Sequence, residues 1–209
     1  MMRFMDAYLL SATVGCGKCF LKDNEKMDTL NIISRYFSPG SLAYNTLIAH
    51  SRMVVGKCLE IAENIRYQAP DISFLKEAAM LHDIGIFLVK APDIGCYGNR
   101  DYICHGYLGR DLLEKEDLPI HALVCERHVG VGLSISDIMD WDLPLPPRDM
   151  LPVTLEEKII CYADKFYSKK PNALCSEKTL EEVREDIRKY GDDMLQRFDE
   201  MTLLFNKPR

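Results

Sequence analysis

Apolar residues recur at helical intervals along most of the chain, and no stretch shows the strict alternation of a convincing strand. Breaks at Ser38-Pro39-Gly40 and Ala69-Pro70 separate the first periodic stretches from one another. The pattern therefore predicts an all-α bundle. The expected helices cover residues 28–37, 41–67, 71–83, 105–115, 120–129 and 154–169, with one or two more between 177 and 205.

Two local patterns refine this picture. Thr154 and Glu157 have the spacing of a capping box, which indicates where the helix over 154–169 begins. Asp164 lies on that helix among apolar residues, so its carboxylate needs a buried partner. Residues 90–104 are rich in glycine, proline and asparagine and are predicted to form a long irregular loop. Loops of this length often contact substrates.

The domain organisation follows from length and composition. With 209 residues, of which 47% are hydrophobic, the chain can bury one substantial core. We expect residues 27–175 to form the domain, residues 176–209 a helical extension packed on it, and residues 1–26 an N-terminal extension. Met27 opens the first clean helical pattern and is a candidate native start. Cys16 and Cys19 have CxxC spacing, but no second ligand pair supports a zinc or redox site.

Charge and cysteine usage limit the classes of partner and compartment. A formal charge of −6 argues against binding to a nucleic-acid polymer, so a phosphorylated partner would need metal ions or a few well-placed cations. Cys58, Cys125 and Cys161 lie in apolar helical patterns, which favours reduced thiols and a cytoplasmic protein. No apolar run reaches the roughly 20 residues that span a bilayer, so we expect no membrane association.

The most distinctive chemistry is the adjacent pair His82-Asp83, which ends an apolar helical run. A carboxylate at this position has two oxygens and can bridge two metal ions. Gly85 then permits a turn. Four imidazoles and two carboxylates suit two divalent transition metals, with Fe, Mn, Co, Ni and Zn all admissible. The candidate ligands are His50, His82, Asp83, His105, His128 and Asp164.

Two of the histidines also have a plainer interpretation. His50, taken alone, has the pattern of a buried histidine with a hydrogen-bond partner. His121 lies seven residues before His128, on a similar helical face, and is interpreted as a residue behind the ligands or at the surface.

The order H…HD…H…H…D, centred on Leu81-His82-Asp83-Ile84-Gly85, resembles the HD superfamily of metal-dependent phosphohydrolases, in its HDIG subgroup, over about residues 41–170. The resemblance implies the all-α HD-domain helical bundle and a binuclear centre. Asp83 would bridge the two metals. The first metal would be held by His50, His82, Asp83 and Asp164, and the second by Asp83, His105 and His128.

The implied reaction is hydrolysis of a phosphoester or phosphoanhydride in a small nucleotide or phosphorylated metabolite, with a metal-bridging water as nucleophile. Lys165 and Arg127 are available to steady phosphate charge, although a surface salt bridge is an equally simple role for each. Some relatives carry a basic residue directly after HDIG, where this chain has Ile86. Substitutes for that residue would be Lys90, Arg100 or Arg110.

Two other functions remain open from the sequence. Some HD proteins with the same six ligands are mixed-valent di-iron oxygenases, and others are catalytically silent nucleotide-sensing proteins. The intact ligand set argues against the silent form. The symmetrical diadenosine tetraphosphate hydrolases share the six-ligand pattern, but no residue of this chain selects their substrate.

Overall fold

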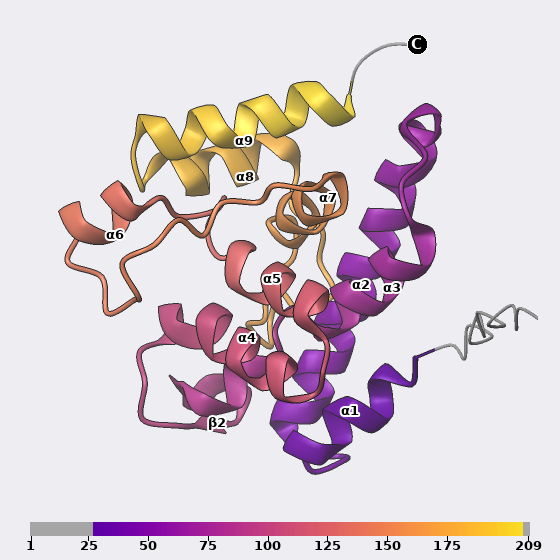
Figure 1. The fold of residues 1–209 in the computed structure, drawn as a ribbon, viewed down its shortest axis with the longest axis vertical. Helices are drawn as coiled ribbons and strands as arrows, with labels where there is room; N and C mark the ends of the chain where they lie inside the picture. The colour runs from indigo at the N-terminus through magenta and orange to yellow at the C-terminus, as the bar shows by residue number, and fades with distance from the viewer. Residues whose placement is uncertain (1–26, 207–209) are drawn as a thin grey trace, which may run out of the picture.

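A computed structural model describes residues 27–206, and these residues are mostly helical, which confirms the predicted all-α bundle (Figure 1). No helix in this range combines the length and apolar composition needed to cross a bilayer. The helices are α1 (Thr29–Tyr36), α2 (Leu42–Asn64), α3 (Ile72–Leu81), α4 (His105–Lys115), α5 (Pro119–Arg127), α6 (Ile135–Asp140), α7 (Leu155–Asp164), α8 (Leu180–Arg188) and α9 (Asp192–Phe205).

Side-chain caps define where the central helices begin. Ser41 accepts a hydrogen bond from the Tyr44 amide at the start of α2, and Asp71 accepts one from the Phe74 amide at the start of α3. The capping box predicted from Thr154 and Glu157 opens α7, with both of its hydrogen bonds present. These caps satisfy backbone donors that have no partner within the helix.

The buried core consists of two clusters that meet along α2. Leu47 belongs to the cluster that α2 shares with α1 and the 3₁₀ turn Ile84–Leu88. Val54, about two turns further along α2, belongs to the larger cluster with α3, α7 and the C-terminal helices. His50 lies between these two residues and is fully buried. The candidate ligand on α2 therefore lies at the junction of the two clusters.

The stretch 90–104 is more regular than the predicted loop. Strands β1 (Lys90–Ala91) and β2 (Cys96–Tyr97) pair antiparallel, and Tyr102–Cys104 forms a 3₁₀ turn before α4. Two-residue strands are too short to show alternation, which is why the sequence pattern did not reveal them. The turn delivers the chain directly to His105, the first residue of α4.

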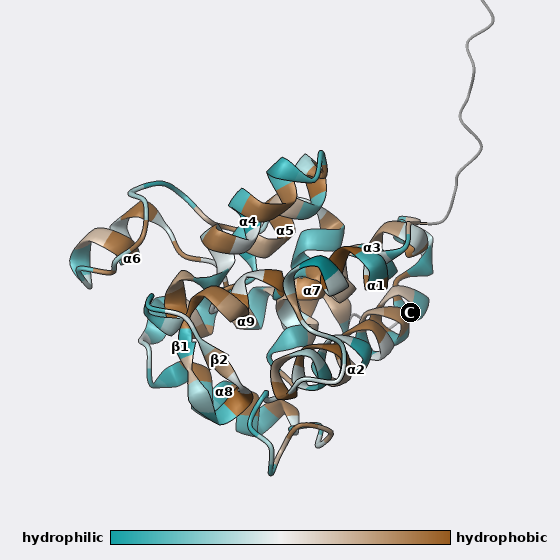
Figure 2. Cartoon of the chain, turned by 90° about the horizontal axis from the view of Figure 1, so that it is seen from below, coloured by the Kyte–Doolittle hydropathy of each residue, from teal (hydrophilic) through white to brown (hydrophobic). Residues whose placement is uncertain are grey.

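The sequence pattern did not predict α6, and it placed the end of α7 too late. The short helix α6 lies at the edge of the molecule in both views (Figures 1 and 2). Helix α7 ends at Asp164 rather than near residue 169, so the predicted ligand lies at a helix end. The C-terminal stretch forms two helices, and Phe198 of α9 stacks on Tyr162 of α7 with ring centroids 4.9 Å apart. Predictions about residues 1–26, including the Cys16–Cys19 pair, lie outside the described residues.

Candidate metal centre

The His82-Asp83 pair directly follows the last residue of α3, where the chain turns tightly against α4. A Cβ atom added at Gly85 would lie 2.2 Å from the carbonyl oxygen of His105 and 2.5 Å from the amide nitrogen of Gly109. Glycine is therefore required here by the close approach of two backbones. The predicted reason, freedom to turn, is secondary. This contact brings Asp83 and His105 into one site.

The structure brings the six predicted ligands together as two groups that share Asp83. In the first group, Asp83 Oδ2 lies 3.2 Å from His50 Nε2 and 3.1 Å from His82 Nε2. Asp164 Oδ1 completes it, 2.9 Å from His50 Nε2. In the second group, Asp83 Oδ1 lies 3.3 Å from the Nε2 atoms of both His105 and His128. The two oxygens of Asp83 thus face different groups, and its side chain is fully buried.

Helix ends supply most of these residues, and backbone carbonyls orient three of the imidazoles. In each of the three, Nδ1 lies at hydrogen-bonding distance from the carbonyl three residues earlier, which fixes the ring and leaves Nε2 facing the cluster. The distances are 2.7 Å from His82 to Ala79, 2.6 Å from His105 to Tyr102 and 2.7 Å from His128 to Cys125. His50 differs, because its buried Nδ1 has no hydrogen-bond partner among the described residues.

The arrangement fits divalent transition metals. With Nδ1 protonated toward a carbonyl, a neutral imidazole presents a lone pair at Nε2, yet the Nε2 atoms of His105 and His128 lie only 3.1 Å apart. Two lone pairs at that distance repel unless a cation offsets them. Both oxygens of Asp83 are buried and face the Nε2 atoms of the clustered histidines at 3.1–3.3 Å. Imidazole and carboxylate donors are the ligand set that such metals bind.

Ionisation in the cluster follows from burial and neighbouring charges. Burial raises the pKa of Asp83 and of Asp164, but His82 and Lys169 beside Asp83, and Lys165 and Lys169 beside Asp164, outweigh it and hold both pKa values well below the ordinary range. Burial also lowers the pKa of His128 to about 3, so this imidazole is neutral. Burial lowers the pKa of His82, but the two carboxylates outweigh that effect and raise it to about 9. A metal ion binding there would replace a proton.

The structure adds one residue that the sequence interpretation missed, Lys169. Its Nζ lies 2.7 Å from Asp83 Oδ2 and 3.9 Å from Asp164 Oδ1. Burial lowers the pKa of Lys169, but these carboxylates outweigh it and hold the pKa well above the usual value. Lys169 falls within the predicted helix over 154–169, whereas α7 ends at Asp164 and the chain then returns toward the cluster. The only indication of this contact in the sequence was that Lys169 follows the predicted ligand Asp164 by five residues.

Lys165 and Arg127, which the sequence predicts as contacts of a substrate phosphate, bind other groups of the protein. Lys165 Nζ lies 2.7 Å from Asp164 Oδ2 and donates a hydrogen bond to the carbonyl of His128, so it joins the ends of α5 and α7. Arg127 Nη1 donates to both carboxylate oxygens of Glu157, at 2.9 and 3.0 Å. A substrate phosphate would have to compete with these pairs, and phosphate binding by Lys165 or Arg127 stays a prediction.

The three predicted substitutes for a basic residue after Gly85 form no ion pair with a candidate ligand among the described residues. Arg110 binds Glu126 and Glu114 through its guanidinium, whereas Lys90 and Arg100 are exposed and make no ion pair within residues 27–206. Ile86 itself is fully buried. Contact of these three cations with a substrate stays a prediction.

His121 belongs to neither ligand group. Its ring lies 4.8 Å from that of Phe74, and its Nε2 lies 3.6 Å from a carboxylate oxygen of Glu77. This placement is consistent with the interpretation of His121 as a residue outside the ligand set.

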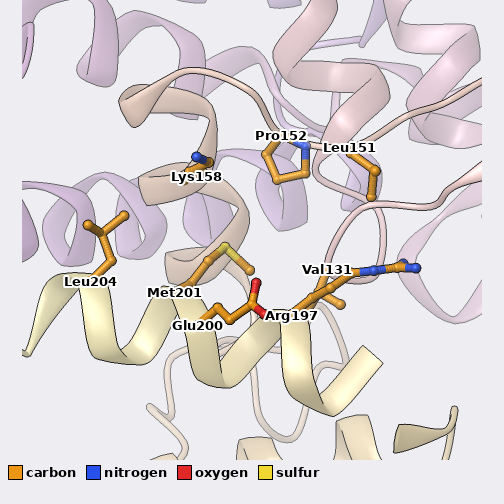
Figure 3. A pocket seen from close by; sticks show the side chains of 8 residues that line it. All are labelled: Val131, Leu151, Pro152, Lys158, Arg197, Glu200, Met201 and Leu204. Atoms are coloured by element: carbon orange, nitrogen blue, oxygen red, sulfur yellow. The ribbon is translucent and has the colours of Figure 1, made fainter. Parts of the chain in front are cut away.

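A cavity of about 260 Å³ lies away from the cluster, between α9 and the segment that leads into α7 (Figure 3). Lys158, Arg197 and Glu200 lie beside the apolar side chains of Met201 and Pro152 in its wall. None of the six candidate ligands lines it. The cavity and the candidate metal centre are therefore separate features.

Comparison with known proteins identifies a family over this same region. The HD domain model matches residues 47–168, which contain all six candidate ligands. An uncharacterised protein of Methanocaldococcus jannaschii is 34% identical over 130 residues, which cover 56% of this chain and 67% of the relative.

Two further relatives are named tRNA (cytidine(56)-2′-O)-methyltransferase. The protein of Thermoplasma volcanium is 28% identical over 71% of this chain, and that of Picrophilus torridus is 29% identical over 60%. The matches span only 38% and 33% of those two proteins. No solved structure matches the chain. Because the family model covers more than half of its length and includes the clustered histidines and aspartates, this chain belongs to the HD domain family.

Proposed function

We propose that this protein is a metal-dependent phosphohydrolase of the HDIG type, with two divalent transition metals and a small phosphorylated substrate. The observation that carries the proposal is Asp83, whose two buried oxygens face two different groups of ligands. His50, His82 and Asp164 would hold the first metal with Asp83, and His105 and His128 the second. Bound metals would activate a water molecule and offset charge on the phosphoryl group.

The residues of this chain support that chemistry in three ways. The carbonyls behind His82, His105 and His128 keep their Nε2 atoms directed at the cluster. Deep burial lowers the effective dielectric around the carboxylates and so strengthens the charge interactions in the cluster. Lys165 holds Asp164 in place from the second oxygen, which leaves Oδ1 directed at the histidines.

A small substrate is favoured over a nucleic-acid polymer. The net charge of −6 opposes approach of an extended polyanion, whereas a compact phosphate can be held by metals and one or two cations. The tRNA methyltransferase name belongs to relatives of which the match covers about a third. The proposal therefore rests on the four imidazoles and two carboxylates of the cluster and on the HD domain match, and not on that name.

The test begins with metal analysis of anaerobically purified protein. We expect about two metal ions per chain, because Asp83 joins two ligand groups. A screen with nucleotides and sugar phosphates, after loading with Mn, Fe, Co, Ni or Zn, should then show phosphate release that a chelator abolishes. His121→Ala is the matched histidine control and should retain activity.

Two other outcomes would replace the proposal with one of its alternatives. Oxygen consumption with an organic substrate under iron loading, without phosphate release, would identify a di-iron oxygenase. Nucleotide binding without hydrolysis under every metal would identify a sensing protein.

A further inference from the structure

Lys169 is the cation whose position the proposed chemistry does not yet explain. Its Nζ lies 2.7 Å from Asp83 Oδ2, on the side of the carboxylate that faces His50 and His82. Within residues 27–206, Asp83 forms ion pairs only with the four clustered histidines and Lys169. Lys169 is therefore the one ammonium group among the described residues that reaches the shared carboxylate.

Exposure increases outward from Asp83 through Lys169. The side chain of Asp83 is fully buried, that of Asp164 is 8% exposed and that of Lys169 is 13% exposed. Tyr102, whose side chain lies near that of Lys169, is 40% exposed. Lys169 is thus the most exposed of the three charged side chains and lies on the side of the cluster nearer to solvent.

Tyr102 also contacts the second ligand group. Its carbonyl oxygen lies 2.6 Å from Nδ1 of His105, and the two rings lie 4.8 Å apart. Lys169 contacts Asp83, which both groups share, so it lies close to both of them.

Metal binding would change the charge that surrounds the ammonium group of Lys169. Metal ions bound by Asp83 and Asp164 would place positive charge beside the Lys169 ammonium group, which lies 2.7 Å from Asp83 Oδ2 and 3.9 Å from Asp164 Oδ1. A largely buried ammonium beside new positive charge requires another anion. Lys165 differs from Lys169, because its ammonium group also donates a hydrogen bond to the carbonyl of His128.

We propose that Lys169, beside the shared carboxylate of Asp83, binds the phosphoryl group of the substrate at the metal centre. This inference rests on the proposed phosphohydrolase function and names a residue for its substrate contact. Some relatives carry a basic residue at the position of Ile86. The inference gives the substrate contact of that residue to Lys169, which follows α7, instead of to Lys90, Arg100 or Arg110.

The test compares Lys169→Met with Lys170→Met, which removes the neighbouring, exposed charge. Each Mn²⁺-loaded variant is titrated calorimetrically with inorganic phosphate, and metal content and the circular dichroism spectrum are recorded. Loss of a charge-assisted hydrogen bond should raise the phosphate Kd of Lys169→Met by about tenfold or more, whereas Lys170→Met should match the wild type. Lys169→Arg should recover most of the affinity.

Kinetics with the best substrate separate binding from a structural role. Lys169→Met should raise KM, with metal content unchanged. Unaltered phosphate affinity in Lys169→Met would overturn the inference while leaving the proposed function intact. Loss of metal from this variant would also overturn it, since Lys169 would then serve to assemble the metal site. Absence of both phosphate binding and hydrolysis in the wild type would reject the proposed function together with the inference.

Discussion

At the scale of single residues, Asp83 is the side chain on which both ligand groups depend. Asp83→Ala removes the carboxylate that the two groups share, so we expect it to lose most bound metal and to abolish turnover. His105→Ala removes a ligand of the second group alone and should reduce metal content to about half. Elemental analysis of the purified variants measures both changes.

His121→Ala is the control for this comparison. His121 is also a buried histidine, but it lies against Phe74 and Glu77 in neither group. The metal content of His121→Ala should equal that of the wild type. Full metal content in Asp83→Ala, or strong loss in His121→Ala, would show that the ligand assignment is wrong.

The cluster of candidate ligands could be predicted from the sequence because its chemistry is rare and its order is specific, whereas its neighbours could not. A His-Asp pair at a helix end, followed by two histidines and a helical aspartate, is a set of residues that suits a metal site and serves few purely structural roles. Lys169 has no such signature, because lysine is common and its contact depends on where α7 ends. The partners of Arg110 and Arg127 likewise depend on packing between helices. Contacts made across the fold leave little trace in local periodicity.

At the scale of elements, one ion pair attaches the short helix α6 to α9. Asp137 of α6 accepts a 2.6 Å hydrogen bond from Arg197, and it also accepts hydrogen bonds from Ser134 at the start of α6. Burial raises the pKa of Asp137, but Arg197 and Ser134 outweigh it and hold the pKa below its ordinary value of 3.8. The pair therefore stabilises the fold above that value, and the contribution is lost as the pH falls through the lower folded-state pKa.

Asp137→Asn should therefore lower the free energy of unfolding at pH 7 by about 1–3 kcal/mol, as expected for a buried hydrogen bond to a charged group. The difference between variant and wild type should shrink as the pH is lowered below about 3.8, where the unfolded carboxyl group is protonated. Urea unfolding of both proteins at several pH values measures this difference in the free energy of unfolding. Asp140→Asn, at an exposed position of the same helix, is the matched control. A difference that is independent of pH would contradict the role of the charge.

Helix α6 also shows why the sequence predicted the longer helices but not the shortest one. The helices that carry or adjoin the candidate ligands have nine or more residues, and all of them were predicted. Helix α6 has six residues, fewer than two turns, so periodicity cannot identify it. Its available signal was the Ser134-x-x-Asp137 capping box, in which aspartate replaces the more usual glutamate.

At the scale of the whole molecule, the C-terminal helices share the main core. Phe198 of α9 is fully buried against Tyr162 and Phe166 of the segment that carries Asp164. Residues 176–209 were predicted as an extension packed on a domain ending at residue 175. That division stays a prediction. The shared aromatic cluster leads us to expect that both parts unfold as a single cooperative unit, which would also release Asp164 from the candidate metal centre.

This expectation can be tested with one core and one surface variant of α9. Phe198→Ala should reduce the free energy of unfolding by about 3–5 kcal/mol, because it removes a fully buried aromatic ring. Leu203→Ala, at a position that is 68% exposed, should change it by less than about 0.5 kcal/mol. Far-ultraviolet circular dichroism and the fluorescence of Trp141, the single tryptophan, should report coincident urea transitions in both variants. If Phe198→Ala instead unfolded α8 and α9 in a separate early transition, with metal content retained, the C-terminal helices would be an independent extension and Asp164 would not depend on them.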